Sequence, residues 1–154
     1  MRNKRILTGL DHSQYEHPFD RKALETLEST PGLAAAGKYV TKQTIERVYT
    51  VQYTGSHLRI TKESYPQIYE YMEYACRILD VKRIPEMYLQ WGFGIDGFTI
   101  GSERPIVVLN SGFMDFLDDD EKLFLLGHEL GHIKSDHMLY HMLAQLINYI
   151  IEMI

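Results

Sequence analysis

The sequence predicts an α+β fold, with helices first, a small sheet in the middle and helices again at the end. Three observations indicate this order. Apolar residues recur at helical spacing in the first half, short β-rich runs separated by glycine and proline follow, and helical spacing returns after Asp118. A chain of 154 residues is long enough to bury one core of its own. We therefore expect one domain over residues 1–154, mainly helical at 1–80, with the sheet and the last helices at 84–154.

Three helices are expected in the mainly helical part. Residues 20–28 look helical, and residues 38–52 repeat apolar side chains at helical spacing up to Thr54-Gly55. The third helix follows Ser64 and carries Pro66 in its first turn, where proline is tolerated. Its expected apolar stripe consists of Ile68, Met72, Ala75 and Leu79, and Cys76 beside it is expected to be a buried structural thiol.

The middle of the chain contains three short β-prone runs, at residues 87–91, 98–100 and 106–109. Pro85 and Pro105 stand near the starts of two of these runs, where the missing N–H costs little. Because glycines separate the runs, we expect one small sheet with tight connections. Trp91, among those glycines, is expected to pack in the core.

Charge and cysteine content limit the classes of partner and the compartment. The formal net charge is -5 and no basic run is present, so nucleic acid is not expected as a partner. The single Cys76 cannot form an intrachain disulfide, and the start of the chain lacks the apolar region of a signal peptide. Both observations favour the reducing cytoplasm.

The helix after the sheet has a clear start and a clear apolar face. Asp118 can cap it, and Glu121 stands at the third helical position, as in a capping box. Acidic residues in its first turn suit the positive end of the helix dipole. The expected core stripe consists of Leu123, Leu126, Leu130 and Ile133.

This helix also contains the pattern His-Glu-x-x-His, within Gly127-His128-Glu129-Leu130-Gly131-His132. On a helix the spacing puts His128 and His132 one turn apart on one face, where both imidazoles can bind one ion. Zinc suits these ligands, and Glu129 can take a proton from a metal-bound water and deliver it to the leaving amine. The pattern therefore predicts a zinc-dependent endopeptidase with Glu129 as general base. Gly127 and Gly131 are expected to permit close approach of another element.

These residues and the following Ile133-Lys134-Ser135-Asp136-His137 resemble the zinc peptidase group (gluzincins) that includes HtpX and the CAAX prenyl proteases. The similarity covers residues 87 to about 143, although Asp96-Gly97-Phe98 stands where that group has an Asn-Ala-Phe edge strand. The resemblance implies a zincin-like domain in which a substrate peptide adds as an extra strand along Gly97, Phe98 and Thr99. A plain hairpin edge is the alternative for this segment.

A catalytic zinc site needs a third protein ligand, which the resemblance places on a downstream helix, as a Glu beyond residue 154. Glu152 follows His132 at a spacing that thermolysin-like enzymes use, but it continues a polar line at helical spacing and is not expected to be the ligand. On a continuous helix His137 points away from the metal, so a structural or supporting role is expected for it. Asp136 is a candidate for holding an imidazole, with solvated charge as the alternative.

Residues 138–154 predict an apolar helix with a polar line and no stop signal, which indicates the N-terminal portion of a longer peptidase. The segment is too short and too polar for a good membrane span. We expect it to pack on further protein, on another copy of the chain or peripherally on a membrane.

Two alternatives to a peptidase acting on a peptide or protein substrate remain open. One is a zincin-like module that binds or scaffolds peptides without cleaving them. The other is a structural zinc site, which would need four protein ligands where two are clear. The histidines outside the motif helix and its continuation, His12, His17 and His57, are expected at the surface.

Overall fold

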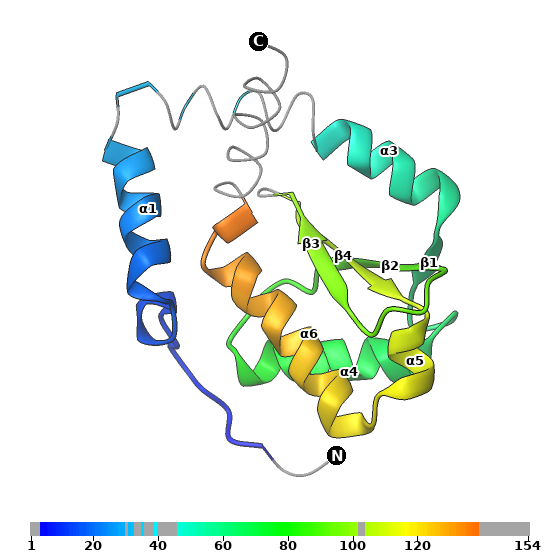
Figure 1. Cartoon of the computed structure of the whole chain (residues 1–154). Coiled ribbons are helices and arrows are strands. Elements are labelled where there is room, and N and C mark those ends of the chain that lie inside the picture. Colours follow the sequence, from blue (N-terminus) through cyan, green and yellow to red (C-terminus); the bar gives the residue numbers. More distant parts are fainter. Residues whose placement is uncertain are drawn as a thin grey trace.

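The structure is a computed structural model that describes residues 4–29, 31–32, 35, 39, 46–101 and 104–138. In this part of the chain, α-helices and one four-stranded sheet follow each other in the expected order (Figure 1), so the α+β prediction is confirmed. The elements are η1 (His12–Gln14), α1 (Pro18–Ser29), α3 (Glu46–Ser56), β1 (Leu58–Ile60), α4 (Pro66–Ile78), β2 (Glu86–Gln90), β3 (Gly97–Ile100), β4 (Ile106–Asn110), α5 (Gly112–Phe116) and α6 (Asp119–Lys134).

The sheet has the strand order β1-β2-β4-β3. Strands β2 and β4 run parallel in its centre, and β1 and β3 pair antiparallel at its two edges. The three predicted strands are present, but β1 was not anticipated because only Ile60 of its three residues is buried. Gly97 pairs with Leu109 and Ile100 with Ile106, so β3 has β4 as its neighbour on one side and forms an edge of the sheet.

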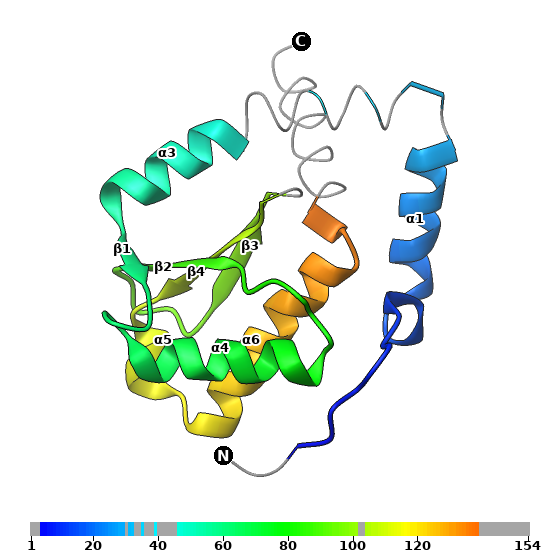
Figure 2. The same ribbon diagram turned by 180° about the vertical axis from the view of Figure 1, so that it is seen from behind.

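The central strands bury both faces, which is why they read as continuous apolar runs. Figure 2 shows α4 and α6 together on one side of the sheet and α3 on the other. The face toward α4 and α6 carries Met87, Leu89, Val107 and Leu109. The opposite face carries Tyr88, Ile106 and Val108, which pack with Tyr53 of α3.

Helix α4 forms as its sequence predicts. Pro66 lies in its first turn, and its buried residues are Ile68, Tyr71, Met72, Ala75 and Cys76. Burial raises the pKa of the Cys76 thiol to about 11, which suits an inert structural residue. The Tyr71 hydroxyl donates a hydrogen bond of 2.5 Å to Asp119 in the first turn of α6, so the two helices are tied side by side.

Trp91 contradicts the prediction that it packs in the core, because its side chain is 82% exposed. The loop that starts at Trp91 folds back onto the start of α5: Gly112 N–H donates to Gly92 O, and a Cβ on Gly112 would lie 2.5 Å from Gly94 O. This close backbone approach leaves Trp91 on the outside, where its ring meets that of Phe93 edge to face at 5.1 Å.

Helix α6 begins with the expected capping box. The Asp118 carboxylate accepts from Glu121 N–H at 2.9 Å, and the Glu121 carboxylate accepts from Asp118 N–H at 2.8 Å. Leu123, Leu126 and Leu130 are buried as predicted. The helix ends at Lys134, however, and the backbone turns at Asp136 with φ +51°, so the helix does not continue to His137.

The N-terminal segment, which we define as residues 4–17, runs past the end of α4 toward the end of α6. Leu7 N–H donates to Ile78 O at 2.9 Å, and Gly9 N–H donates to the Asp80 carboxylate at 2.9 Å. Gly9 has φ +67°, a conformation that glycine adopts without strain. These bonds direct the residues after Gly9 toward the end of α6, where the Tyr15 hydroxyl lies 3.4 Å from the Gly131 carbonyl. Residues 139–154, with the predicted terminal helix, lie outside the described residues.

Candidate metal centre

Helix α6 brings the two predicted ligand histidines together. The Nε2 atoms of His128 and His132 are 3.1 Å apart, and the two rings are nearly perpendicular. Two imidazole nitrogens that share one zinc ion at about 2.0–2.1 Å in tetrahedral geometry lie roughly 3.3 Å from each other. The arrangement of His128 and His132 therefore fits a shared zinc ion by distance and by donor type.

Glu129, one residue after His128, faces the sheet and is only 3% exposed. Its Oε2 accepts a hydrogen bond of 2.7 Å from the Thr99 hydroxyl on β3. Burial raises the pKa of Glu129, and the negative charge of Asp96 adds to the increase, while Thr99 and His128 oppose it. A carboxylate that is desolvated in this way is a stronger base than a free one, which suits proton transfer near neutral pH.

The edge strand β3 supplies the wall of the site beside Glu129. A Cβ on Gly97 would lie 3.9 Å from the Glu129 Cγ, so Gly97 and Thr99 are on the side of the strand that faces α6. Phe98 points to the other side, where its ring lies 5.9 Å from that of Tyr53. The three residues predicted to bind a peptide thus lie on an edge strand next to the metal helix, and peptide binding itself stays a prediction.

The loop that leads into β3 is fixed by polar side chains that sequence reasoning did not assign. The Asn110 amide donates to the Asp96 carboxylate at 2.6 Å and accepts from the Gln90 amide at 2.7 Å. Asn110 and Gln90 sit opposite each other at the ends of the parallel strands β4 and β2. The register of this central pair therefore also fixes where Asp96 enters the edge strand.

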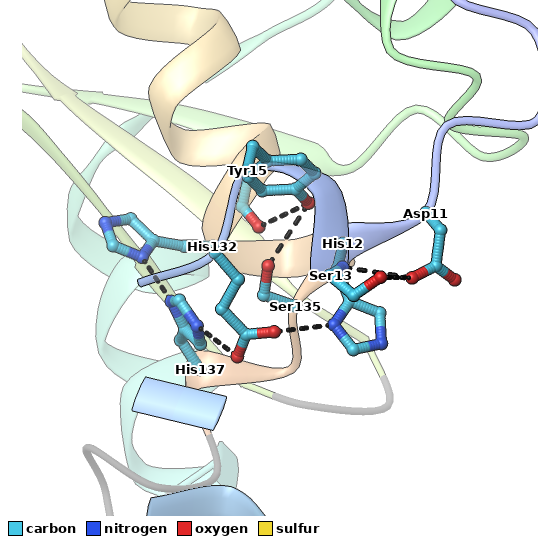
Figure 3. Close-up of polar contacts among 9 residues, drawn as sticks. Asp11, His12, Ser13, Tyr15, His132, Ser135 and His137 are labelled. Carbon is cyan, nitrogen blue, oxygen red and sulfur yellow. Dashed lines mark hydrogen bonds and ion pairs between the residues drawn. The ribbon is translucent and has the colours of Figure 1, made fainter. Parts of the chain in front are cut away.

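His137 contacts the candidate ligand His132, which its out-of-phase position on a continuous helix did not predict. Its Nδ1 lies 3.2 Å from the Nδ1 of His132, and its Nε2 lies 3.1 Å from the Glu16 carboxylate (Figure 3). The reason is the turn at Asp136, which swings the chain back toward His132 after the helix has ended. The supporting role that was one of the expectations for His137 agrees with this contact. For Asp136 the imidazole-holding role stays a prediction.

The N-terminal segment also reaches this place through His12, which lies at the surface as expected, with a side chain that is 40% exposed. Its Nδ1 lies 2.7 Å from the second oxygen of the Glu16 carboxylate, and Figure 3 shows both early residues and late residues gathered in one polar cluster. His17 is exposed, as expected, whereas His57 is partly buried with its ring 4.7 Å from that of Tyr53. Sequence spacing alone could not connect His12 with a helix more than a hundred residues later.

Tyr15 and Ser135 add further contacts between the N-terminal segment and the end of α6. The Ser135 hydroxyl donates to the Tyr15 hydroxyl at 3.2 Å, and the Tyr15 hydroxyl lies 3.4 Å from the Gly131 carbonyl. A Cβ on Gly131 would lie 3.8 Å from the Tyr15 ring, and one on Gly127 would lie 3.9 Å from Leu79. These are ordinary van der Waals distances, so Tyr15 and Leu79 approach α6 no more closely than alanine would allow, and the expected close approach at the two glycines is not found.

Two neighbouring cavities open at the histidines and share His128. One, of about 410 Å³, lies between α4 and α6 and is lined mainly by apolar side chains, including Leu79, Leu123 and Phe124. The other, of about 310 Å³, lies between α6 and the N-terminal segment. The candidate metal position is therefore accessible from the surface.

His128 and His132 are the two candidate metal ligands among the described residues. Within residues 4–29, 46–101 and 104–138, no cluster of three or more His, Cys, Asp or Glu side chains has the geometry to hold an ion. Glu152 and the remainder of the terminal segment lie outside the described residues. Among the helices that are described, none is long and apolar enough to cross a membrane.

Comparison with known proteins agrees with the geometry of the site. Plastoglobule-localized metallopeptidase 48, chloroplastic, from Arabidopsis thaliana is 26% identical over 134 residues, which are 86% of this chain and 39% of that protein. The chain thus spans about two fifths of the length of this curated relative. Residues 70–154, more than half of the chain, match Peptidase family M48, and this part contains the sheet centre and the whole of α6. The chain therefore belongs to peptidase family M48.

Proposed function

We propose that the protein is a zinc-dependent endopeptidase in which Glu129 is the general base. The observation that carries the proposal is the arrangement on α6, where two imidazole Nε2 atoms converge beside a buried carboxylate. Membership in a peptidase family supports the same activity. The finer assignment to the group of HtpX and the CAAX prenyl proteases is part of this proposal.

In the proposed reaction His128 and His132 hold zinc together with a third ligand from outside the described residues. When bound, zinc lowers the pKa of a water molecule and polarises the peptide carbonyl. A Glu beyond residue 154 is the third ligand that we propose, and Glu152 is the less favoured candidate. One position of the ion is then left for water or substrate, as a catalytic site requires.

Glu129 moves the proton in this scheme. Its carboxylate takes a proton from the attacking water as the new C–O bond forms, and it delivers that proton to the amine nitrogen as the C–N bond breaks. Thr99 holds the Oε2 atom by its hydrogen bond, which leaves Oε1 for proton transfer. Because burial raises the pKa of Glu129, its carboxylate accepts a proton near neutral pH more readily than an exposed one does.

The substrate that we propose is an extended peptide or protein segment that pairs with β3. An edge strand offers main-chain N–H and C=O groups for an added strand, and β3 lies against the helix that carries Glu129. Main-chain pairing along Gly97 to Thr99 would present a peptide bond close to the ligand histidines. The side chains of the peptide would then decide specificity.

Location and assembly belong to the proposal as well. The relative from Arabidopsis thaliana carries plastoglobule-localized and chloroplastic in its name. For this protein we propose a cytoplasmic location with peripheral membrane contact or self-association through residues 138–154. Flotation with lipid vesicles and light scattering, each with and without these residues, test the two contacts separately.

The test of the activity is hydrolysis of an unstructured substrate, fluorescent casein, by the zinc-loaded protein in a form that includes the third ligand proposed beyond residue 154, and by the Glu129→Gln variant of that form. We expect cleavage by the wild type, inhibition by a zinc chelator that added zinc reverses, and loss of cleavage in Glu129→Gln with zinc retained. Phe116→Ala, at a 65% exposed position on the neighbouring helix α5, is the control and is expected to remain active. Cleavage by Glu129→Gln at the wild-type rate would contradict the role of Glu129.

A peptide-binding module that does not cleave is the second candidate, because the edge strand could serve binding alone. It predicts that the zinc-loaded wild type binds extended peptides but releases them intact. Analysis of the bound peptide by mass spectrometry separates this outcome from hydrolysis.

A further inference from the structure

We propose that Glu16 positions the ligand His132 through His137, so that a carboxylate near the start of the chain organises the metal site. This inference rests on the proposed function, in which His132 holds zinc. It makes Glu16 a positioning residue, since its carboxylate contacts His137 and His12 and reaches the zinc position through two imidazole rings.

The contacts form one continuous line. The Glu16 Oε1 atom lies 3.1 Å from His137 Nε2, and His137 Nδ1 lies 3.2 Å from His132 Nδ1. On the opposite side of its ring, His132 Nε2 faces His128 Nε2 at 3.1 Å. Every ring nitrogen along this line therefore has a partner at hydrogen-bonding distance.

One placement of protons satisfies the whole line. If the Nε2 of His132 is a metal ligand, it carries no proton, so His132 must be protonated at Nδ1. That N–H can donate to an unprotonated Nδ1 of His137, whose remaining N–H at Nε2 then donates to the Glu16 carboxylate. Each donor has one acceptor, and the lone pair of His132 points to the zinc position.

The carboxylate at the end of the line is built into the fold. The Glu16 side chain is 0% exposed and the His137 side chain is 14% exposed. An enclosed carboxylate is costly unless hydrogen bonds compensate it, and here His137 and His12 each contact one of its two oxygens. Burial alone would raise the pKa of Glu16, but these hydrogen bonds outweigh it and the pKa lies below the ordinary value.

Independent contacts hold both partners of the line in place. Leu7 ties the N-terminal segment to the last residue of α4, Gly9 ties it to Asp80 just beyond, and Tyr15 ties it to the end of α6. Ser135 is 1% exposed and donates a hydrogen bond to the Tyr15 hydroxyl, just before the turn that leads to His137. The segments that carry Glu16 and His137 are therefore held next to each other by contacts other than the bond between these two residues.

Partners that orient a ligand histidine typically change metal affinity or activity by about 10–100-fold when they are removed. We therefore expect Glu16→Gln, which keeps the size of the side chain but not its charge, to weaken zinc binding by about 10-fold or more. His137→Ala is expected to weaken it to a similar degree. The double variant should bind zinc about as tightly as the single variant with the lower affinity, because both changes break the same series of hydrogen bonds from Glu16 to His132.

The experiment measures zinc affinity by competition with a chromophoric chelator, with thermal unfolding of the metal-free proteins as the test of folding. His12→Ala is the matched control, since it removes the other contact of Glu16 and leaves the line to His132 intact. It should change zinc affinity less than Glu16→Gln does. Glu16→Asp, which retains the charge, should bind zinc more tightly than Glu16→Gln.

A measurement on the unchanged protein completes the test. Nitrogen-15 NMR of the zinc-loaded wild type is expected to report a proton at Nδ1 of His132 and at Nε2 of His137. The opposite tautomer at either ring overturns the inference, and so does wild-type zinc affinity in folded Glu16→Gln and His137→Ala. A wild type that binds no zinc would instead overturn the proposed function, and the inference with it.

Discussion

Two enclosed carboxylates in two regions of the molecule have pKa values shifted in opposite directions. Glu129 faces the sheet, where the Thr99 hydroxyl is its hydrogen-bond donor, and burial raises its pKa. Glu16 lies in the N-terminal segment, where burial also acts to raise the pKa but hydrogen bonds from His12 and His137 lower it further than burial raises it. The number and charge of the donors therefore decide the outcome.

Because their pKa values shift in opposite directions, the two glutamates are suited to different chemical roles. A carboxylate with a raised pKa and one neutral donor can accept a proton, which is the task of a general base. A carboxylate held by two imidazoles remains an anion and can orient those rings. The sheet side of α6 is thus suited to proton transfer, and the N-terminal side is suited to holding a ligand in place.

The largest expected effect compares the two carboxylates in catalysis. Glu129→Gln should lower kcat by about 10²–10⁴-fold, because it removes general-base catalysis. Glu16→Gln should lower kcat/KM by about 10–100-fold at limiting zinc, and excess zinc should restore part of that loss. Steady-state hydrolysis at two zinc concentrations checks both. Equal losses that zinc does not relieve would remove the distinction between the two roles.

Core packing on the sheet side gives the next effect. Leu126 is 0% exposed at the contact between α6 and α4, so Leu126→Ala should lower the free energy of unfolding by about 2–5 kcal/mol. Tyr15→Phe, which removes only the hydroxyl contacts of the N-terminal segment, should lower it by about 0.5–1.5 kcal/mol. Denaturant titration measures both. If Tyr15→Phe lowered the free energy of unfolding more than Leu126→Ala does, the contacts of the N-terminal segment would contribute more to stability than core packing, contrary to this comparison.

Opposite pKa shifts predict opposite pH dependences of stability in the metal-free protein. Because the folded state lowers the pKa of Glu16, this residue stabilises the fold above its unfolded pKa, and the gain is lost as pH falls through the folded pKa. Because the folded state raises the pKa of Glu129, this residue destabilises the fold as pH rises through that raised value.

At pH 7 we therefore expect Glu16→Gln to lower and Glu129→Gln to raise the free energy of unfolding. Both differences should shrink in acid, where each carboxyl group is protonated in the folded and the unfolded state. Thermal unfolding from pH 3 to pH 8 provides the measurement. Changes of the same sign at pH 7 would contradict the comparison.

The smallest expected change in stability concerns the two glycines of α6, Gly127 and Gly131, of which only Gly131 faces the N-terminal segment. Gly127 lies opposite Leu79 and Gly131 lies opposite Tyr15, with room for a Cβ at both. Alanine has a higher helix propensity than glycine, so each Gly→Ala change should raise the free energy of unfolding by up to about 1 kcal/mol. Destabilisation by Gly131→Ala alone would indicate that the Tyr15 contact is tighter than its distance suggests.

The sheet side of the site could be predicted because its signals are local. The spacing of His128, Glu129 and His132 places them on one helix turn, and Asp118 with Glu121 specifies where that helix begins. Continuous apolar runs likewise specified the two buried central strands. For these elements, the interactions that determine the secondary structure are made by residues only a few positions apart in the sequence.

The N-terminal side could not be predicted, because its contacts join residues far apart in the sequence. The bond between Glu16 and His137 spans 121 positions, and neither residue stands in a pattern that suggests the other. The turn at Asp136 has no glycine or proline to mark it. Trp91 was misassigned for a related reason, since the close backbone packing of Gly112 on its loop arises only in the fold.

The central claim is that His128 and His132 bind one zinc ion and that Glu129 acts beside it without being a ligand. Zinc stoichiometry and affinity test it most directly, measured on a form of the protein that includes the third ligand proposed beyond residue 154, as the wild type and as the His128→Ala, His132→Ala and Glu129→Gln variants. We predict one zinc per chain in the wild type and in Glu129→Gln, and loss of tight binding in both histidine variants. Absence of zinc from the wild type, or its loss in Glu129→Gln alone, would contradict the account.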